Sequence, residues 1–478
     1  MRGRSLLHRL VAQIRVAPEP APPAVARPQP TAPPPRPLLA PAAPPLMQIE
    51  QRILDRFWPQ MRDALQAELD ALAVAEHAGT PPVCCGAPMP RHDRRPVTCQ
   101  TWLGRIRIPV RRYRCRRCKR DRRPLVDQLE LEPGHPSGLL ARWLGLLGCV
   151  ASYTQAADLT AHLLRVEVNA MTVWRAVQRL GETAARHTEA LSAHHADLRT
   201  DRPLHADAPA AVVVAVDGCM LGMQVRGRRR RRTTPDQILP ALPPVEDGHF
   251  REVKTGVLLI PAERVALSPE RHTVVRRALV TCLGNADQLF ARLWAHLAEL
   301  EWIGPHTVVV VVGDGAEWIW NRASHFANVC EILDFWHALE HAWTYARLQF
   351  EEGSPQAGQW THRLAHDLKT GRVRDVIARL TTQQPRSDAS RTALDALIQY
   401  YTDHAARMRY DEYLRLGYGI GSGAVESAHK QIVQARFRQA GMRWSALGAR
   451  RLLALRLLWL NGQWATTAQL RMPQSLAA

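Results

Sequence analysis

The stretch AVVVAVDGCM at residues 211–220 is a nearly unbroken run of β-branched and small apolar residues that leads into an acid, Asp217. Continuous apolar runs of this length are typical of strands that are buried on both faces of a sheet. A second such run, HTVVVVVGDGAEWIW at residues 306–320, again leads into an acid, Asp314. The two runs therefore predict two central strands, each ending in a carboxylate.

Further strand and helix patterns alternate along the surrounding chain. REVKTGVLLIPA at residues 251–262 predicts a strand, and the amphipathic segment after it predicts a helix that begins near Asn285. CEILDFWHALEHAW at residues 330–343 predicts a short strand that ends in Asp334 and runs into another helix. Alternating strands and helices indicate an α/β sheet, in which sites form beyond the carboxyl ends of the strands. An Asp before Gly at a strand end is commonly a turn residue, which is the alternative for each aspartate taken alone.

A third acid lies in GIGSGAVESAHKQIVQARFRQ, residues 419–439. Glu426 follows small residues that predict a loop leading into a helix, and every charged residue after it in this stretch is basic. A structural role is one interpretation, because the helix macrodipole and a Lys430 partner four residues on both favour an acid here. Three carboxylates at one sheet edge can instead hold two divalent cations through oxygen ligands.

The composition of the 478 residues is strongly basic, with 63 Lys and Arg against 44 Asp and Glu and a formal net charge of +19. Such an excess indicates a polyanionic partner, usually nucleic acid, although an arginine-rich proteome is the alternative. Five consecutive arginines at residues 228–232 are expected to be solvated and are suited to lie along DNA. No apolar run reaches the roughly 18 residues that a membrane span needs.

The N-terminal part begins with a Pro/Ala-rich segment, residues 17–46, which predicts a linker without a packed core. Apolar residues at intervals of four then predict a helix from Met47 to His77. Farther on, Ile106, Ile108 and Val110 alternate with arginines, which predicts a β-hairpin that turns at Gly104.

Cysteines flank this hairpin in the layout of a zinc ribbon. Nine cysteines, an odd number, indicate metal ligands and free thiols in a reducing compartment. Cys115 and Cys118 form a CxxC knuckle, whereas the first knuckle is irregular. The expected zinc ligands are Cys85, Cys115 and Cys118, and the candidates for the fourth position are Cys84, His92 and Cys99. A degenerate ribbon that folds without metal is the alternative, and the hairpin arginines suit phosphate contact in both cases.

Residues 137–200 have a helical pattern in which SYTQAADLTAHLLRVEVNAMTVWRAVQRLGE resembles a helix-turn-helix. The recognition helix of such a unit lies in the major groove. The first helix is expected to pack through Ala156, Ala157 and Leu159, and the second carries Met171, Val173, Trp174 and Val177. An ordinary helical bundle is the alternative.

In this order, the segments resemble a bacterial insertion-sequence transposase of the DDE type, close to the ISKra-type group and more distantly similar to Mutator-like elements. The resemblance runs from about Pro81 to Trp464. Its motifs are VAVDG around Asp217, REVKTG at 251–256, GDGAEWIW around Asp314, a (C/D)xxH-like Asp334-Phe-Trp-His337, and GSGAVESAHKQIVQARFRQAGMRW around Glu426.

The resemblance implies an α/β chain with an RNase H-like catalytic core and an all-α insertion. A zinc-ribbon-like β-hairpin module and a helical, helix-turn-helix-like DNA-binding region are expected to precede the core. The implied boundaries are 1–46 for the Pro/Ala-rich N-terminus, 47–80 for a helix, 81–125 for the ribbon, 137–200 for the helical region, 208–350 for the first part of the core, 351–415 for the insertion, 416–465 for the last part of the core with its Glu, and 466–478 for a tail.

The implied function is metal-dependent cleavage at insertion-sequence ends and strand transfer into target DNA. Asp217, Asp314 and Glu426 are the implied catalytic residues and the ligands of two Mg²⁺ ions, and zinc is the implied metal of the ribbon. Asp334 and His337 are further site candidates. The residues expected to contact DNA are Arg251, Lys254, Lys430, Arg436, Arg438 and Arg443.

The implied partners are the terminal repeats and target DNA, bound by a dimer or larger assembly in the bacterial cytoplasm, at the nucleoid. Two other functions fit the same residues: an RNase H-like nuclease without strand transfer, and a non-catalytic zinc-ribbon and helix-turn-helix DNA-binding protein. His337 and His341, four residues apart on one helix, are expected to pack rather than bind metal. Trp318 and Trp320 are expected in the core, with stacking on an unpaired base as the alternative.

Overall fold

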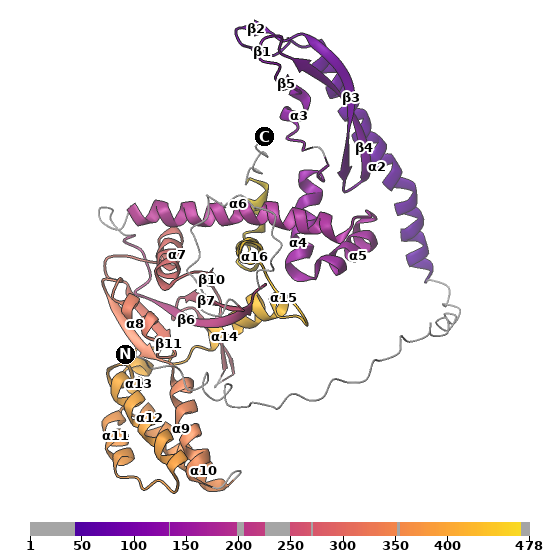
Figure 1. Cartoon of the computed structure of the whole chain (residues 1–478). Helices are drawn as coiled ribbons and strands as arrows, with labels where there is room; N and C mark the ends of the chain where they lie inside the picture. The colour runs from indigo at the N-terminus through magenta and orange to yellow at the C-terminus, as the bar shows by residue number, and fades with distance from the viewer. Residues whose placement is uncertain are drawn as a thin grey trace, which may run out of the picture. The chain divides into compact units, whose positions relative to one another are not determined.

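The computed structural model describes residues 44–132, 134–197, 205–224, 249–268, 271–350 and 354–469 (Figure 1). Most of the Pro/Ala-rich segment and the arginine block at 228–232 lie outside these residues. The chain divides into two units, Met1–Phe57 and Trp58–Ala478. The described part of the first unit is the exposed N-terminal part of helix α2 (Pro45–Ala78). Among the described residues, no helix has both the length and the apolar character needed to cross a membrane.

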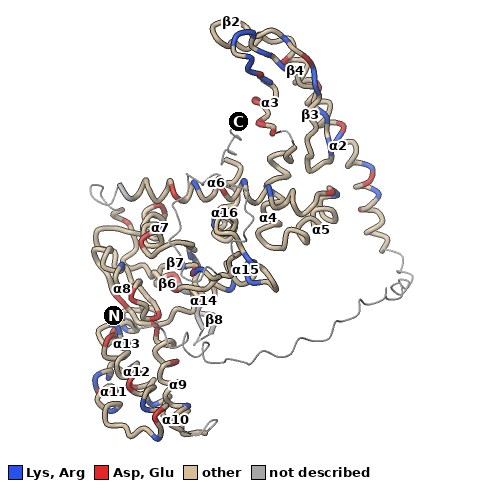
Figure 2. The backbone as a smooth tube through the Cα atoms, in the orientation of Figure 1, with Lys and Arg blue, Asp and Glu red and all other residues tan. Residues whose placement is uncertain are grey.

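The second unit begins within α2 and continues into the cysteine-flanked hairpin. Its elements are β1 (Val83–Cys84), β2 (Ala87–Pro88), β3 (Arg91–Thr101), β4 (Gly104–Arg114), β5 (Asp121–Arg122) and α3 (Pro124–Gln128). Strands β3 and β4 pair antiparallel, and the alternation predicted for β4 is present, with Ile106, Ile108 and Val110 buried. These side chains pack with Leu69 of α2 and Leu125 of α3. Arg105 and Arg107, which alternate with the isoleucines, are left on the surface, where basic residues follow the hairpin (Figure 2).

Three helices follow: α4 (Gly138–Val150), α5 (Tyr153–Leu164) and α6 (Ala170–Asp197). A capping box between Ser152 and Gln155 starts α5 by pairing two otherwise unsatisfied N–H groups. Ala156 and Ala157 are buried as predicted, but Leu159 is exposed, so its predicted packing role is wrong. Helix α6 packs against α4 and α5, and it also contacts α7 (Ala286–Glu299) and α16 (Ala446–Leu460).

A five-stranded mixed sheet forms the centre of the second unit. Its strands are β6 (Ala211–Gly222), β7 (Phe250–Leu259), β10 (Arg277–Cys282), β11 (Val308–Gly313) and β12 (Val329–Leu333), in the order β10-β7-β6-β11-β12. Strands β10, β7 and β6 pair antiparallel, whereas β6, β11 and β12 pair parallel. A separate hairpin, β8 (Arg264–Ser268) and β9 (Arg271–Val274), connects β7 to β10. The observed α/β architecture is compatible with the predicted core.

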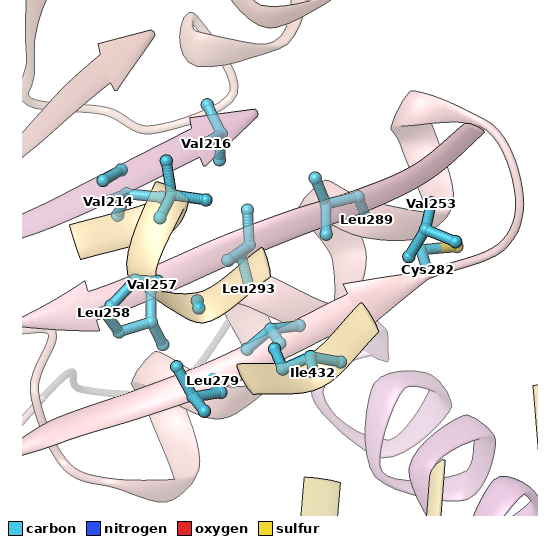
Figure 3. Packing of buried hydrophobic residues seen from close by; sticks show 14 of the residues in the cluster. Val214, Val216, Val253, Val257, Leu258, Leu279, Cys282, Leu289, Leu293 and Ile432 are labelled. Atoms are coloured by element: carbon cyan, nitrogen blue, oxygen red, sulfur yellow. The ribbon is translucent and has the colours of Figure 1, made fainter. Parts of the chain in front are cut away.

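Helices cover both faces of this sheet. Helix α7, which begins after Asn285 as predicted, packs on β7 and β10, where a Cβ on Gly256 would lie 2.5 Å from Leu293. Helix α14 (Gly423–His429) covers the other face, and it continues through the π-helical turn η2 (Lys430–Gln434) into α15 (Ala435–Phe437). Valines and leucines of the sheet fill the space between these layers, with Leu289 and Leu293 of α7 and Ile432 of η2 (Figure 3).

Helices also make up most of the described residues between 335 and 415. They are α9 (Phe335–Gln349), α10 (Pro355–Lys369), α11 (Val373–Thr381), α12 (Asp388–His404), η1 (Ala405–Arg407) and α13 (Tyr410–Arg415). Helix α9 starts directly after β12 and packs against α10 and α12. The chain then returns to the sheet through the loop before α14 and ends in α16 and η3 (Trp464–Ala468).

Candidate active site

Three aspartates lie in one row across adjacent parallel strands. Ala215 of β6 pairs with Val312 of β11, so the residues two positions farther on, Asp217 and Asp314, align with each other. Gly313 of β11 pairs with Leu333 of β12, so the next positions align Asp314 with Asp334. The register of the sheet therefore brings together acids that are far apart in the sequence.

Asp217 does not end its strand, contrary to the prediction. Strand β6 continues to Gly222 and stays paired with β7, where Asp217 faces Thr255. Gly218 is therefore not a turn residue. A Cβ at this position would lie 1.8 Å from the Glu252 carboxylate, so the glycine allows that side chain to cross the strand.

Asp314 lies directly after β11 and is half-buried. Burial raises the pKa of its carboxyl group, the Ala316 N–H that donates to Oδ1 over 3.1 Å opposes this rise, and the nearby Asp217 carboxylate adds to it. Two carboxylates that repel each other in this way form a site that is suited to a cation. The Tyr400 hydroxyl donates to the Asp314 backbone oxygen over 2.9 Å, which connects α12 to this strand end.

Asp334 has a structural role in the row, since its side chain is only 1% exposed. Its Oδ1 accepts the His337 N–H over 2.8 Å and caps α9, while Oδ2 accepts the Ser422 N–H. The Phe335 N–H also donates to the Ile420 oxygen over 2.8 Å. Because backbone amides occupy both of its oxygens, Asp334 holds the loop before α14 on the end of β12.

Glu426 lies on α14, which packs on β6 and β7. The helix starts beside Asp334 of β12, where the Ser422 N–H donates to Oδ2, and contacts Asp217 of β6 at His429, so Glu426 lies along the helix between these two contacts. Its carboxylate is exposed and forms no ion pair with Lys430 in the described structure. Within the described ranges, only a cysteine cluster brings three or more potential ligand atoms within 4.8 Å of one another, so the three acids do not form a closed ligand group.

His429 is a site residue that the sequence interpretation missed. It is 5% exposed, and its Nδ1 lies 3.4 Å from Oδ2 of Asp217. Its buried Nε2 has no hydrogen-bond partner. The sequence indicated this role only through the position of His429 three residues after Glu426, because residues at this spacing are neighbours on a helix surface.

A buried arginine supports the helix that carries Glu426 and His429. Arg456 of α16 is 4% exposed, and its guanidinium donates to the backbone oxygens of Gln431 and Ile432 in η2 and of Cys149 at the end of α4. A π-helical turn is often found at a functional site. The extra donors of Arg456 satisfy carbonyl groups at this irregular turn and attach it to α4.

The predicted DNA contacts fall into two groups. Lys430, Arg438 and Arg443 are exposed, and Arg251 is half-buried. Lys254 and Arg436 are buried, so neither side chain is accessible to DNA in this structure. Lys254 pairs with Glu252 and lies 4.8 Å from the Trp318 ring, whereas Arg436 donates to the Gly148 oxygen over 2.9 Å.

Aromatic and histidine side chains pack beside Asp314. His341 stacks on Tyr400 with ring centroids 4.0 Å apart, and His337 lies edge-on to His341 at 5.3 Å. His337 is also 3.3 Å from Glu340. Trp320 is buried as expected. No group of three potential ligands forms around these histidines within the described residues.

Cys84, Cys85, Cys115 and Cys118 bring their sulfur atoms within 4.8 Å of one another and could bind zinc. The backbone N–H groups of Cys118 and Arg117 lower the pKa of Cys115 to about 6, which favours the thiolate that zinc requires. Four sulfur donors at such distances fit a closed structural site. Cys84 completes the set, whereas Cys99 packs in the core beneath the hairpin and His92 lies outside the cluster.

Comparisons with known proteins give little similarity. No protein-family model matches the chain, and a search of curated proteins gives no match. Among solved structures, the Drosophila P element transposase strand transfer complex is 10% identical, covers 69% of this chain and 80% of its own, and has a TM-score of 0.23. Similarity at this level supports no conclusion about the fold or function, which rest on the geometry above.

Proposed function

We propose that this protein is a DDE-type DNA transposase related to the insertion-sequence transposases of the ISKra-type group. The observation that carries the proposal is the register that aligns Asp217 with Asp314, with Asp217 in contact with the helix that bears Glu426. The proposed activity is metal-dependent cleavage at the ends of the insertion sequence, followed by strand transfer into target DNA.

The order of the five strands is compatible with the proposed RNase H-like core. Helices α10 to α13 lie within residues 351–415, where the all-α insertion is proposed. The ribbon-like module, with its many exposed arginines, and helices α4 to α6 are proposed to bind DNA outside the active site. Cleavage of paired ends would require a dimer or larger assembly.

Asp217, Asp314 and Glu426 would hold two Mg²⁺ ions, which would supply Lewis-acid stabilisation of the attacking and leaving oxygens in a phosphate displacement. The repulsion between the two aspartates supports this assignment, because cations would relieve it. His429 acts as a positioning residue for Asp217, and Asp334 fixes the start of the helix that carries Glu426. No side-chain nucleophile is needed.

The basic residues beyond Glu426 are placed to hold the DNA strand. Exposed Lys430, Arg438 and Arg443 follow Glu426 along the chain, and Arg438 donates to the Met220 oxygen over 3.0 Å. The Trp444 N–H donates to the Gly222 oxygen over 3.1 Å, so this segment lies along the part of β6 beyond Asp217. Positive charge therefore adjoins the carboxylates, as phosphate binding requires.

The test is cleavage of a supercoiled plasmid that carries the gene's own flanking DNA, with Mg²⁺ and either the unaltered protein or Glu426→Gln. We expect breaks at the element boundaries and joined donor–target products with the unaltered protein. Glu426→Gln should lower cleavage by at least about 10³-fold, since metal positioning is lost while DNA binding is retained. The matched control is Glu301→Gln, an exposed acid outside the site.

Each alternative outcome would favour a different function for this protein. Cleavage by Glu426→Gln at the unaltered rate would remove this residue from the site. Cleavage without joined products would identify a nuclease that lacks strand transfer. DNA binding without breaks under either Mg²⁺ or Mn²⁺ would favour a non-catalytic DNA-binding protein.

A further inference from the structure

Trp336 is an exposed aromatic side chain next to the row of aspartates. It follows Asp334 by two residues, in the first turn of α9. Its relative exposure is 59%, higher than that of any other tryptophan that the structure describes. An indole of this size normally contributes to a core or to an interface, because exposing its apolar area to water is unfavourable. The ring is therefore accessible to a binding partner.

The indole is held in place by its neighbours. A Cβ on Gly421 would lie 2.9 Å from Cδ1 and 3.1 Å from Nε1 of Trp336, so the ring lies against the Gly421 backbone. The buried ring of Phe335 contacts it edge-on, with centroids 5.3 Å apart. A ring fixed in this way loses little conformational entropy when a partner stacks on it.

A cation lies beside this ring. Lys369 is exposed at the end of α10, and its Nζ is 4.8 Å from the Phe335 ring and 5.6 Å from the Trp336 ring. Lys369 forms no ion pair with a carboxylate in the described part of the chain. An exposed ring for a base and an ammonium group for a phosphate are the two groups that bind a nucleotide of a single strand.

The location of Trp336 and Lys369 in the fold connects them to the proposed reaction. Gly421 belongs to the loop that leads into α14, five residues before Glu426. A strand with a phosphate over Asp217 and Asp314 would have its next nucleotides close to this loop. The base concerned must be unpaired, because a base inside a duplex is already stacked on both faces.

We propose that Trp336 and Lys369 form a binding site for an unpaired nucleobase of the DNA strand next to the scissile phosphate. The base stacks on the indole, and the adjacent phosphate contacts the Lys369 ammonium group. The proposal rests on the proposed function and deepens it. Trp318 and Trp320 do not offer this site, because the first ring is half-buried and the second is buried.

The test measures binding without cleavage. The full-length protein with Glu426→Gln is mixed with a fluorescent 20-base-pair duplex that carries a four-nucleotide single-stranded tail. The same duplex with an abasic tail is the comparison, and anisotropy gives both affinities at about 0.1 M salt. We expect the tail with bases to bind about 5- to 100-fold more tightly, as base–aromatic stacking predicts.

Trp336→Ala should abolish this preference, and Trp336→Phe should retain part of it. Lys369→Ala should weaken binding of both tails and reduce its salt dependence. The matched control is Leu348→Ala, an exposed apolar residue farther along α9, which should keep the full preference. An unchanged preference in Trp336→Ala would overturn the proposal.

A protein partner, which is the alternative to a nucleobase, is tested with the same variant. If Trp336→Ala changes the oligomeric state in analytical ultracentrifugation and leaves the base preference intact, the ring belongs to a protein interface and the proposal is wrong. The experiments distinguish failure of this proposal from failure of the proposed function. If the unaltered protein does not cleave DNA but the preference for the tail with bases persists, the transposase function is wrong and the nucleobase site stands.

Discussion

At the scale of single residues, His341 makes folding stability depend on pH. Burial lowers the pKa of His341 to about 4, and the nearby His337 and His404 act in the same direction. The unfolded chain, with a histidine pKa of about 6.5, therefore binds the proton first. Its contribution to stability is present above pH 6.5 and is lost as the pH falls from there towards 4.

The expected loss between pH 7 and pH 5 is about 1–2 kcal/mol after allowance for solvent screening, since His341 is partly exposed. His341→Gln removes the titrating group, so its melting temperature should fall less between these two pH values than that of the unaltered protein. His362→Gln, on the exposed surface of α10, is the control and should keep the full difference. Equal pH differences in His341→Gln and the unaltered protein would rule out this role.

At the scale of elements, patterns within one segment were predictable from the sequence. The apolar run before Asp217, the alternation around Ile106 and the helix start at Asn285 all depend on neighbouring residues, and each element formed. The continuation of β6 past Asp217 depends on pairing with β7 and on the Glu252 side chain that crosses Gly218. Such a partner is not visible in the local pattern, so the strand end was misplaced.

The same limit applies to the candidate site. The acids Asp217, Asp314 and Glu426 were identifiable because each has a distinct sequence context, and the register then aligned the two aspartates. The contact of His429 with Asp217 and the burial of Arg436 arise from packing between distant segments. These features required the three-dimensional structure.

The π-helical turn η2 depends on one distant side chain, which makes it testable. Arg456→Met removes the donors to Gln431, Ile432 and Cys149 and leaves buried carbonyl groups unsatisfied. Each such group costs about 1–3 kcal/mol, so we expect destabilisation of about 3 kcal/mol and a lower cleavage rate. Arg363→Met, on the exposed surface of α10, is the control for melting temperature and cleavage. A melting temperature unchanged by Arg456→Met would show that η2 needs no support from this side chain.

At the scale of the whole molecule, exposed basic residues occur both on the hairpin module and beside the candidate site. The hairpin β3–β4 carries exposed arginines, whereas the acids of the candidate site belong to the central sheet and to helix α14. A phosphate backbone can therefore be bound over a wide area while only one phosphate meets the carboxylates. The contribution of the hairpin arginines to this binding depends on the ribbon-like module being folded.

Binding of zinc by the four cysteines is expected to stabilise the folded ribbon-like module, because the module has only a small core of its own. The protein should contain one zinc ion per chain, and Cys118→Ser should reduce this to about one tenth or less, since a structural site needs all four ligands. Metal analysis measures the zinc content, and Cys330→Ser, outside the cluster, is the control.

Chelation should unfold the hairpin and weaken DNA binding while the sheet keeps its own melting transition, because the acids and their supporting contacts lie in a separate core. Unchanged zinc content in Cys118→Ser would exclude this site, and loss of the sheet transition on chelation would show that the two modules fold as one.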